Sequence, residues 1–81
     1  MRNIVINTSD LGYITKSFRV TTDCTNKKLK ELDEEYGMKY RTQSTTIENL
    51  ANGAEEEGYE FEYKEVPFTR GWDYFARYGN Y

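Results

Sequence analysis

Histidine is absent from this sequence of 81 residues, and cysteine and proline occur once each. Without histidine the chain lacks the commonest general base at neutral pH and the commonest metal ligand. Ser-His and Cys-His nucleophile pairs are therefore excluded, and we expect neither a metal nor another cofactor. Glycine-rich phosphate loops of the standard spacings are also missing. These absences predict a protein that is not an enzyme.

The single cysteine, Cys24, rules out an intrachain disulfide, on which small secreted domains usually depend. No apolar run approaches the roughly 20 residues of a membrane span, and the N-terminus turns polar too soon for a signal peptide. We therefore expect a cytoplasmic protein with no membrane partner, and Met1 indicates a complete small gene product. Lys27 and Lys28 follow Cys24 and favour a thiolate, but a lone small cysteine is more often core filling.

Aromatic residues are abundant, at 16% of the chain, although only 37% of the residues are hydrophobic. Each aromatic side chain buries a large area, so a packed core is expected and disorder is not. A chain of this length has room for one core, which predicts a single domain over residues 1–81. The formal net charge is −3, which does not match the basic profile of typical nucleic-acid binders.

Alternation of apolar and polar residues predicts the strands. Residues 3–7 and 13–22 form an N-terminal β-hairpin with Gly12 in its turn. The clearest alternation covers residues 59–64, and residues 38–43 are a weaker candidate for another strand. We expect three aromatic side chains of the clearest strand to face the core: Tyr59, Phe61 and Tyr63.

Two helices are predicted between these strands. The first begins at Thr25 or Asn26 and ends at Gly37, and the second runs from Thr45 to Gly58. The fold class is thus α+β, with a three- to four-stranded, mainly antiparallel sheet, two helices on one face and an aromatic C-terminal tail.

The tail from residue 69 onward has two possible structures. A short helix would place Trp72 and Phe75 against the core, whereas a final strand would alternate its side chains between two faces. We favour the helix, on whose surface Arg70 and Asp73 would pair.

Two acidic triplets fall in the last turns of the predicted helices, where the helix macrodipole disfavours negative charge. They are Asp33, Glu34 and Glu35 in the first helix, and Glu55, Glu56 and Glu57 in the second. Three lysines crowd the positive end of the first helix: Lys27, Lys28 and Lys30. A sequence shaped only for stability would reverse these charges. One interpretation is an acidic surface for a basic partner, such as the nucleic-acid channel of another protein. The other is two solvated helix ends screened by salt.

The tail is a second candidate for binding, because Trp, Tyr and Arg dominate the hot spots of interfaces. Its candidate residues are Arg70, Trp72, Tyr74, Arg77, Tyr78 and Tyr81, beside Phe68 and Phe75. The alternative is that Trp72 and Phe75 complete a small core, which we favour for these two residues. For Tyr74, Arg77, Tyr78 and Tyr81 an interface and plain exposure are equally plausible.

We therefore predict a small protein-binding module that covers a surface of a larger macromolecule. Its size and composition suit an inhibitor or accessory factor, of the kind that a phage or mobile element encodes. A second hypothesis is a binder of single-stranded nucleic acid or nucleotides that stacks bases on the tail aromatics. A third is a homo-oligomer whose tail forms the subunit interface.

Overall fold

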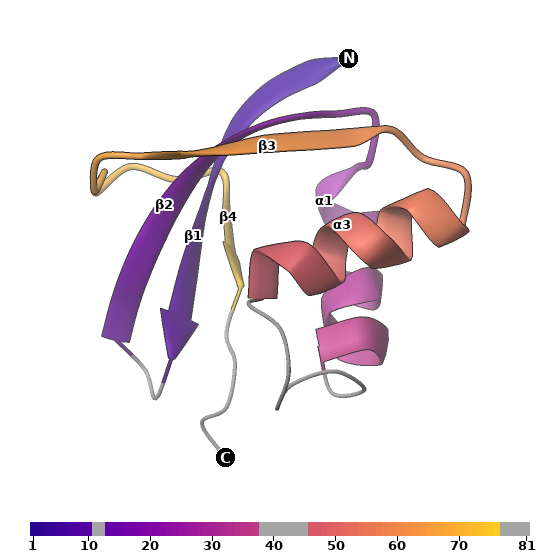
Figure 1. Ribbon diagram of the computed structural model, residues 1–81, viewed down its shortest axis with the longest axis horizontal. Helices are drawn as coiled ribbons and strands as arrows, with labels where there is room; N and C mark the ends of the chain where they lie inside the picture. The colour runs from indigo at the N-terminus through magenta and orange to yellow at the C-terminus, as the bar shows by residue number, and fades with distance from the viewer. Residues whose placement is uncertain (11–12, 38–45, 77–81) are drawn as a thin grey trace.

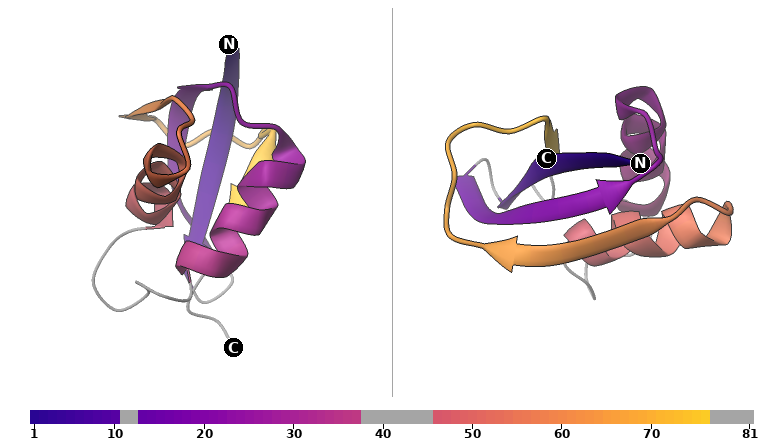
Figure 2. Two further views of the ribbon diagram at one scale, coloured as in Figure 1. Left: turned by 90° about the vertical axis from the view of Figure 1, so that its right-hand side faces the viewer. Right: turned by 90° about the horizontal axis from the view of Figure 1, so that it is seen from above.

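The described part of the chain folds into a four-stranded β-sheet with helices packed on one face (Figures 1 and 2). This computed structural model describes residues 1–10, 13–37 and 46–76. The strands are β1 (Arg2–Asp10), β2 (Tyr13–Thr22), β3 (Phe61–Val66) and β4 (Tyr74–Ala76), in the order β3-β2-β1-β4. The helices are α1 (Asn26–Leu32), which continues into the π-helical turn η1 (Asp33–Gly37), and α3 (Thr46–Glu56). The predicted α+β class is confirmed, whereas the candidate strand over 38–43, Gly12 and Thr45 lie outside the described residues.

The hairpin determines which face of the sheet is buried. Ile4 and Ile6 of β1 pair with Val20 and Phe18 of β2, so these four side chains project from one face. All four are buried under the helices, and we call this the inner face. The helices complete the core with Leu29, Leu32, Ile47, Leu50, Ala51 and Ala54.

Both helices have the end signals that the sequence predicts. Thr25 caps α1, and its hydroxyl accepts a hydrogen bond from the backbone N–H of Lys28 at 3.1 Å. After α3, Gly58 has a φ of 86°, a conformation that only glycine adopts without strain. This turn lets the backbone N–H of Tyr59 donate to the carbonyl of Ala54 at 2.9 Å, which ends the helix and leads into β3.

Strand β3 confirms the predicted alternation, with one correction. Phe61 is buried and Tyr59 is half-buried against the core, but Tyr63 is 41% exposed. Tyr63 projects from the same face and meets the ring of Phe18 edge-on at 5.9 Å. It stays exposed because β3 is an edge strand that extends beyond α3 (Figure 1).

The prediction of a helical tail is wrong. Residues 74–76 form β4, which pairs parallel to β1 with Ile6 opposite Tyr74 and Thr8 opposite Ala76. The free edge of β1 supplies backbone partners that a short isolated helix would lack, and isolated helices of this length are marginal. Trp72 consequently lies before the strand and is 45% exposed. Phe75 is half-buried and lies outside the core cluster, so the expectation that these two residues complete the core is also wrong.

Residues 67–73 connect β3 to β4 and cross the face of the sheet opposite the helices (Figure 2). We call this segment the crossing loop and this face the outer face. The molecule therefore has three layers: the helices, the sheet and the crossing loop.

Candidate functional site

The crossing loop is fixed to the sheet at its centre. The backbone N–H of Thr69 donates to the Ser17 hydroxyl at 3.0 Å, and the Asn7 side-chain amide donates to the Thr69 carbonyl at 2.7 Å. Asn7 and Ser17 face each other across β1 and β2, and the loop buries both of them. Two small polar side chains thus supply hydrogen-bond partners for backbone groups of the loop.

The loop is fixed again where it enters β4. The backbone N–H of Asp73 donates to the Val5 carbonyl at 2.8 Å, and the Asp73 carboxylate accepts from the Val5 N–H at 2.8 Å. The Asn26 side chain, at the start of α1, donates to the Asp73 carbonyl at 3.1 Å. The predicted pair between Arg70 and Asp73 is therefore wrong, because this carboxylate binds the backbone of β1 instead.

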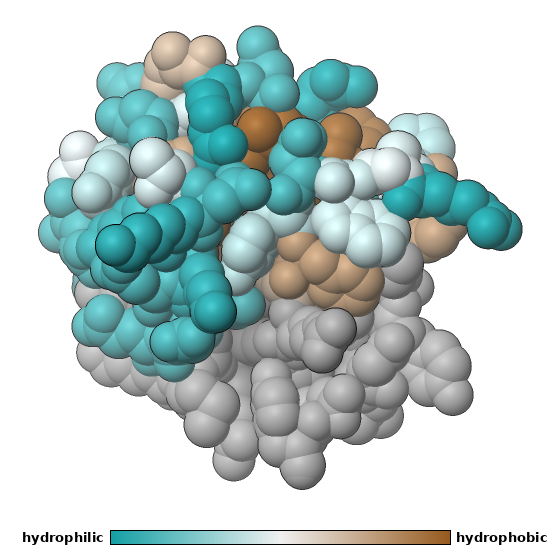
Figure 3. All heavy atoms as spheres, turned by 180° about the vertical axis from the view of Figure 1, so that it is seen from behind, coloured by the Kyte–Doolittle hydropathy of each residue, from teal (hydrophilic) through white to brown (hydrophobic). Residues whose placement is uncertain are grey.

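Large aromatic rings lie on the solvent side of this fixed loop. Trp72 is 45% exposed and Phe68 is 57% exposed. The ring of Phe75, which is half-buried in β4, meets Trp72 edge-on with a centroid distance of 5.1 Å. We call Phe68, Trp72 and Phe75 the aromatic surface. On this side of the molecule apolar side chains reach solvent between hydrophilic ones (Figure 3).

Tyr74, another candidate residue, lies on the inner face. Its hydroxyl donates to Oδ2 of Asp33 at 3.3 Å, which connects β4 to η1. Burial, reinforced by the charge of Asp33, raises the pKa of the Tyr74 phenol well above its usual range. The structure thus separates Tyr74 from the aromatic surface and pairs it with a member of the first acidic triplet.

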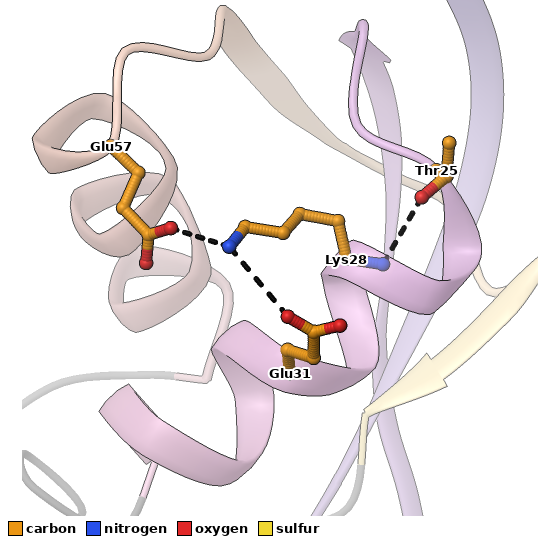
Figure 4. A network of polar contacts seen from close by, with 4 residues as sticks. All are labelled: Thr25, Lys28, Glu31 and Glu57. Carbon is orange, nitrogen blue, oxygen red and sulfur yellow. Dashed lines mark hydrogen bonds and ion pairs between the residues drawn. The ribbon is translucent and has the colours of Figure 1, made fainter.

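A member of the second triplet also has an internal partner. The Lys28 ammonium of α1 contacts the Glu57 carboxylate just after α3, and it lies 3.7 Å from Oε1 of Glu31 (Figure 4). Lys28 also lies 5.7 Å from the centre of the Tyr59 ring, within range of a cation–π contact. The hydrogen bond that Lys28 donates to the Glu57 carboxylate is the main cause that raises the pKa of Lys28.

This contact explains part of the charge pattern that opposes the helix dipoles. The first turn of α1 lies beside the last turn of α3 (Figure 4). Lys28 therefore faces the negative end of α3, and Glu57 faces the positive end of α1. Each charge is unfavourable for its own helix and favourable for the neighbouring one.

The two triplets do not form one acidic surface. Glu57 lies beside the first turn of α1, whereas Asp33 lies after its last turn, in η1, with Tyr74. All members except Asp33 are exposed, and Glu34, Glu35, Glu55 and Glu56 are the exposed members outside these two contacts. Arg77, Tyr78 and Tyr81 lie outside the described residues.

The structure also brings together two basic residues that the sequence analysis did not single out. Arg19 of β2 and Lys64 of β3 are register partners, and both are exposed on the outer face. Alternation in β2 already places Arg19 on the face of the strand that lies away from the buried Phe18 and Val20. The pairing with Lys64 depends on the register of β2 and β3, which no sequence signal fixes.

Cys24 is buried, and this burial raises the pKa of its thiol, so the prediction of core filling is confirmed. Within residues 1–10, 13–37 and 46–76, no cluster of cysteine and carboxylate side chains is arranged to hold a metal ion. None of the helices in this part of the chain has the length and apolar character that crossing a bilayer requires. Comparison with protein-family models, curated proteins and solved structures finds no match.

Proposed function

We propose that this chain is a small non-enzymatic protein-binding module, an inhibitor or accessory factor that covers part of a larger protein with its aromatic surface. The observation that carries the proposal is the exposed Trp72, edge-on to Phe75, on a loop held by hydrogen bonds to Asn7, Ser17 and Val5. Tryptophan is the residue most enriched at binding hot spots, because it buries a large area at low entropic cost.

The fixed backbone of the crossing loop supports this proposal. A binding segment that is already ordered loses little conformational entropy when the partner arrives, so more of the interaction energy appears as affinity. The hydrogen bonds at Thr69 and Asp73 provide that order on both sides of Arg70 and Trp72. We place this activity in the cytoplasm, because the fold contains one cysteine and relies on no disulfide.

The acidic helix ends are the weaker candidate surface. Glu57 and Asp33 already contact Lys28 and Tyr74, so binding a basic partner there would compete with contacts within the protein. The remaining exposed carboxylates are divided between two places. Rim charges of this kind mainly influence association rate and salt dependence rather than affinity.

Affinity capture from the source cell, followed by measurement of the dissociation constant for the captured protein, tests the proposal. Trp72→Ala should weaken binding by at least about 30-fold, the effect of a hot spot of about 2 kcal/mol. The matched control is Glu55→Gln with Glu56→Gln, which removes two exposed charges from α3 and should change affinity by less than about threefold.

Two results would contradict the proposal. The first is a captured protein whose affinity depends on Glu55 and Glu56 but not on Trp72. The second is an affinity capture in which the wild-type protein retains no cellular protein that the Trp72→Ala variant does not also retain. Circular dichroism of each variant must match the wild type, since Trp72 lies outside the core.

A further inference from the structure

We infer that the partner segment bound by the aromatic surface is an acidic, extended stretch of polypeptide. This inference rests on the proposed function and adds the chemistry of the partner. Its basis is the outer face of the sheet, where Arg19 and Lys64 lie directly opposite each other on neighbouring strands. Both side chains are exposed, and both are on the side of the sheet that carries the crossing loop.

Two like charges directly opposite each other destabilise a β-sheet. Among the residues that the structure describes, neither Arg19 nor Lys64 has a carboxylate within ion-pair distance. The inner face differs, because Lys16 of β2 lies 3.9 Å from Glu65 of β3. The chain thus neutralises a lysine on one face and leaves a repulsive basic pair on the other.

Arg70 adds a third positive charge on the outer side, on the crossing loop. It is exposed on the crossing loop, next to Thr69, whose backbone is bound to Ser17 and Asn7. Within the described ranges Arg70 makes no ion pair with Asp73, whose carboxylate accepts a hydrogen bond from the backbone N–H of Val5.

The arrangement has the dimensions of a short extended peptide. Lys64, Arg19 and Val5 are register neighbours on β3, β2 and β1, so they form a row about 10 Å long at the usual strand spacing. The row lies beside the crossing loop, which carries the two exposed rings of the aromatic surface. Roughly three or four residues of an extended chain span such a row.

The distribution of charge also favours a polypeptide over a nucleic acid as the partner. The whole chain has a formal net charge of −3, and Glu62 is the next outward residue of β3 after Lys64. A long polyanion would gain few phosphate contacts here and would meet repulsion beyond the row. A segment with a few carboxylates and an apolar side chain for Trp72 fits both the local positive charge and the overall negative one.

The test is a selection from a displayed library of random peptides of about 12 residues, longer than the row requires. The immobilised wild-type protein should enrich peptides richer in Asp and Glu than the unselected library. Binding of an enriched synthetic peptide should fall roughly fivefold in the variant Arg19→Gln with Lys64→Gln, and should weaken as salt rises. Lys27→Gln with Lys30→Gln, which removes two exposed charges from α1, is the matched control and should leave affinity unchanged.

The other outcomes separate this inference from the proposed function. Enriched peptides that are neutral or basic, and that need Trp72 but not Arg19 and Lys64, would overturn the inference and leave the proposed function standing. Enrichment no greater than that on the Trp72→Ala variant would count against the proposed function itself. Saturable quenching of Trp72 fluorescence by an oligothymidine of about 15 nucleotides at moderate salt would overturn the inference. It would identify single-stranded nucleic acid as the partner instead of a peptide.

Discussion

At the scale of single residues, Lys28 illustrates how a charge can oppose its own helix and still stabilise the fold. Its ammonium lies at the positive end of α1, but it contacts Glu57, which lies at the negative end of α3. Because the two helix ends are neighbours, one ion pair corrects two unfavourable placements. The acidic triplet 55–57 is therefore partly a structural feature rather than only a surface for a partner.

This pairing predicts a coupling between the two residues. Lys28→Met and Glu57→Gln should each lower the urea midpoint of unfolding, and the double variant should lose less than the sum of the two. The coupling should shrink at high salt, because both side chains are partly accessible to solvent. Lys27→Met is the control, since Lys27 is exposed on the same turn. Strict additivity of the two losses would show that the contact contributes nothing.

The same ion pair predicts how the stability of the fold changes at alkaline pH. The contact with Glu57 raises the pKa of Lys28 above its ordinary value of 10.5, so the folded state holds this proton more tightly than the unfolded state. The stabilisation is present in full below pH 10.5 and is lost as the pH rises through the higher folded-state value. As the pH rises above 10.5, the free energy of unfolding of the Glu57→Gln variant should therefore fall less than that of the wild type.

At the scale of elements, the crossing loop acts as a third layer that replaces a helix on the outer face. Its backbone has few partners of its own, so buried side chains of the sheet supply them. Ser17 accepts from the Thr69 N–H, and Asn7 donates to the Thr69 carbonyl. The position of Phe68 consequently depends on two small polar residues in the hairpin, and that of Trp72 also on the contacts of Asp73 with Val5.

Ser17→Ala should cost about 1–3 kcal/mol of unfolding free energy, because it leaves the Thr69 N–H without its partner. Hydrogen exchange of that amide should accelerate even under conditions in which the core amides stay protected. Thr21→Val is the matched control: it removes a hydroxyl on the same face of β2 that donates only to the Asn3 side chain at the surface, and it should change stability by less than about 0.5 kcal/mol. Equal effects of the two substitutions would mean that the loop is not held at Ser17.

At the scale of the whole molecule, the residues of the core and the residues of the candidate binding surface lie on opposite sides of the sheet. The core lies between the helices and the inner face, whereas the aromatic surface and the pair Arg19 and Lys64 lie on the outer side. Substitution of Trp72 therefore tests binding without opening the core. Deletion of residues 70–81 would not do so, because β4 pairs with β1 and buries Ala76.

This separation allows a direct test of self-association. We expect the wild-type protein to have the mass of a monomer by light scattering over about a hundredfold range of concentration. Trp72→Ala should leave this mass unchanged, since the aromatic surface is proposed to bind a different protein. A wild-type dimer that Trp72→Ala dissociates would instead identify the outer side as an interface between two copies of this chain.

The sequence by itself determined the features that depend on local periodicity. Alternation predicted the hairpin and β3, three- and four-residue spacing predicted both helices, and Thr25 and Gly58 predicted two of their ends. Each of these signals lies within one element, where neighbouring side chains decide the structure. The absence of histidine likewise removed a class of chemistry without reference to the fold.

Only the tertiary structure decided the properties of the candidate surfaces. Residues 74–76 become a strand because the free edge of β1 offers backbone partners some 70 residues away in the sequence, and no local pattern encodes that edge. Trp72 is exposed for the same reason, and Arg19 meets Lys64 through a strand register set by the whole sheet. Long-range pairing lies beyond local sequence signals because it depends on which elements pack together, and the candidate binding surface is built from such pairings.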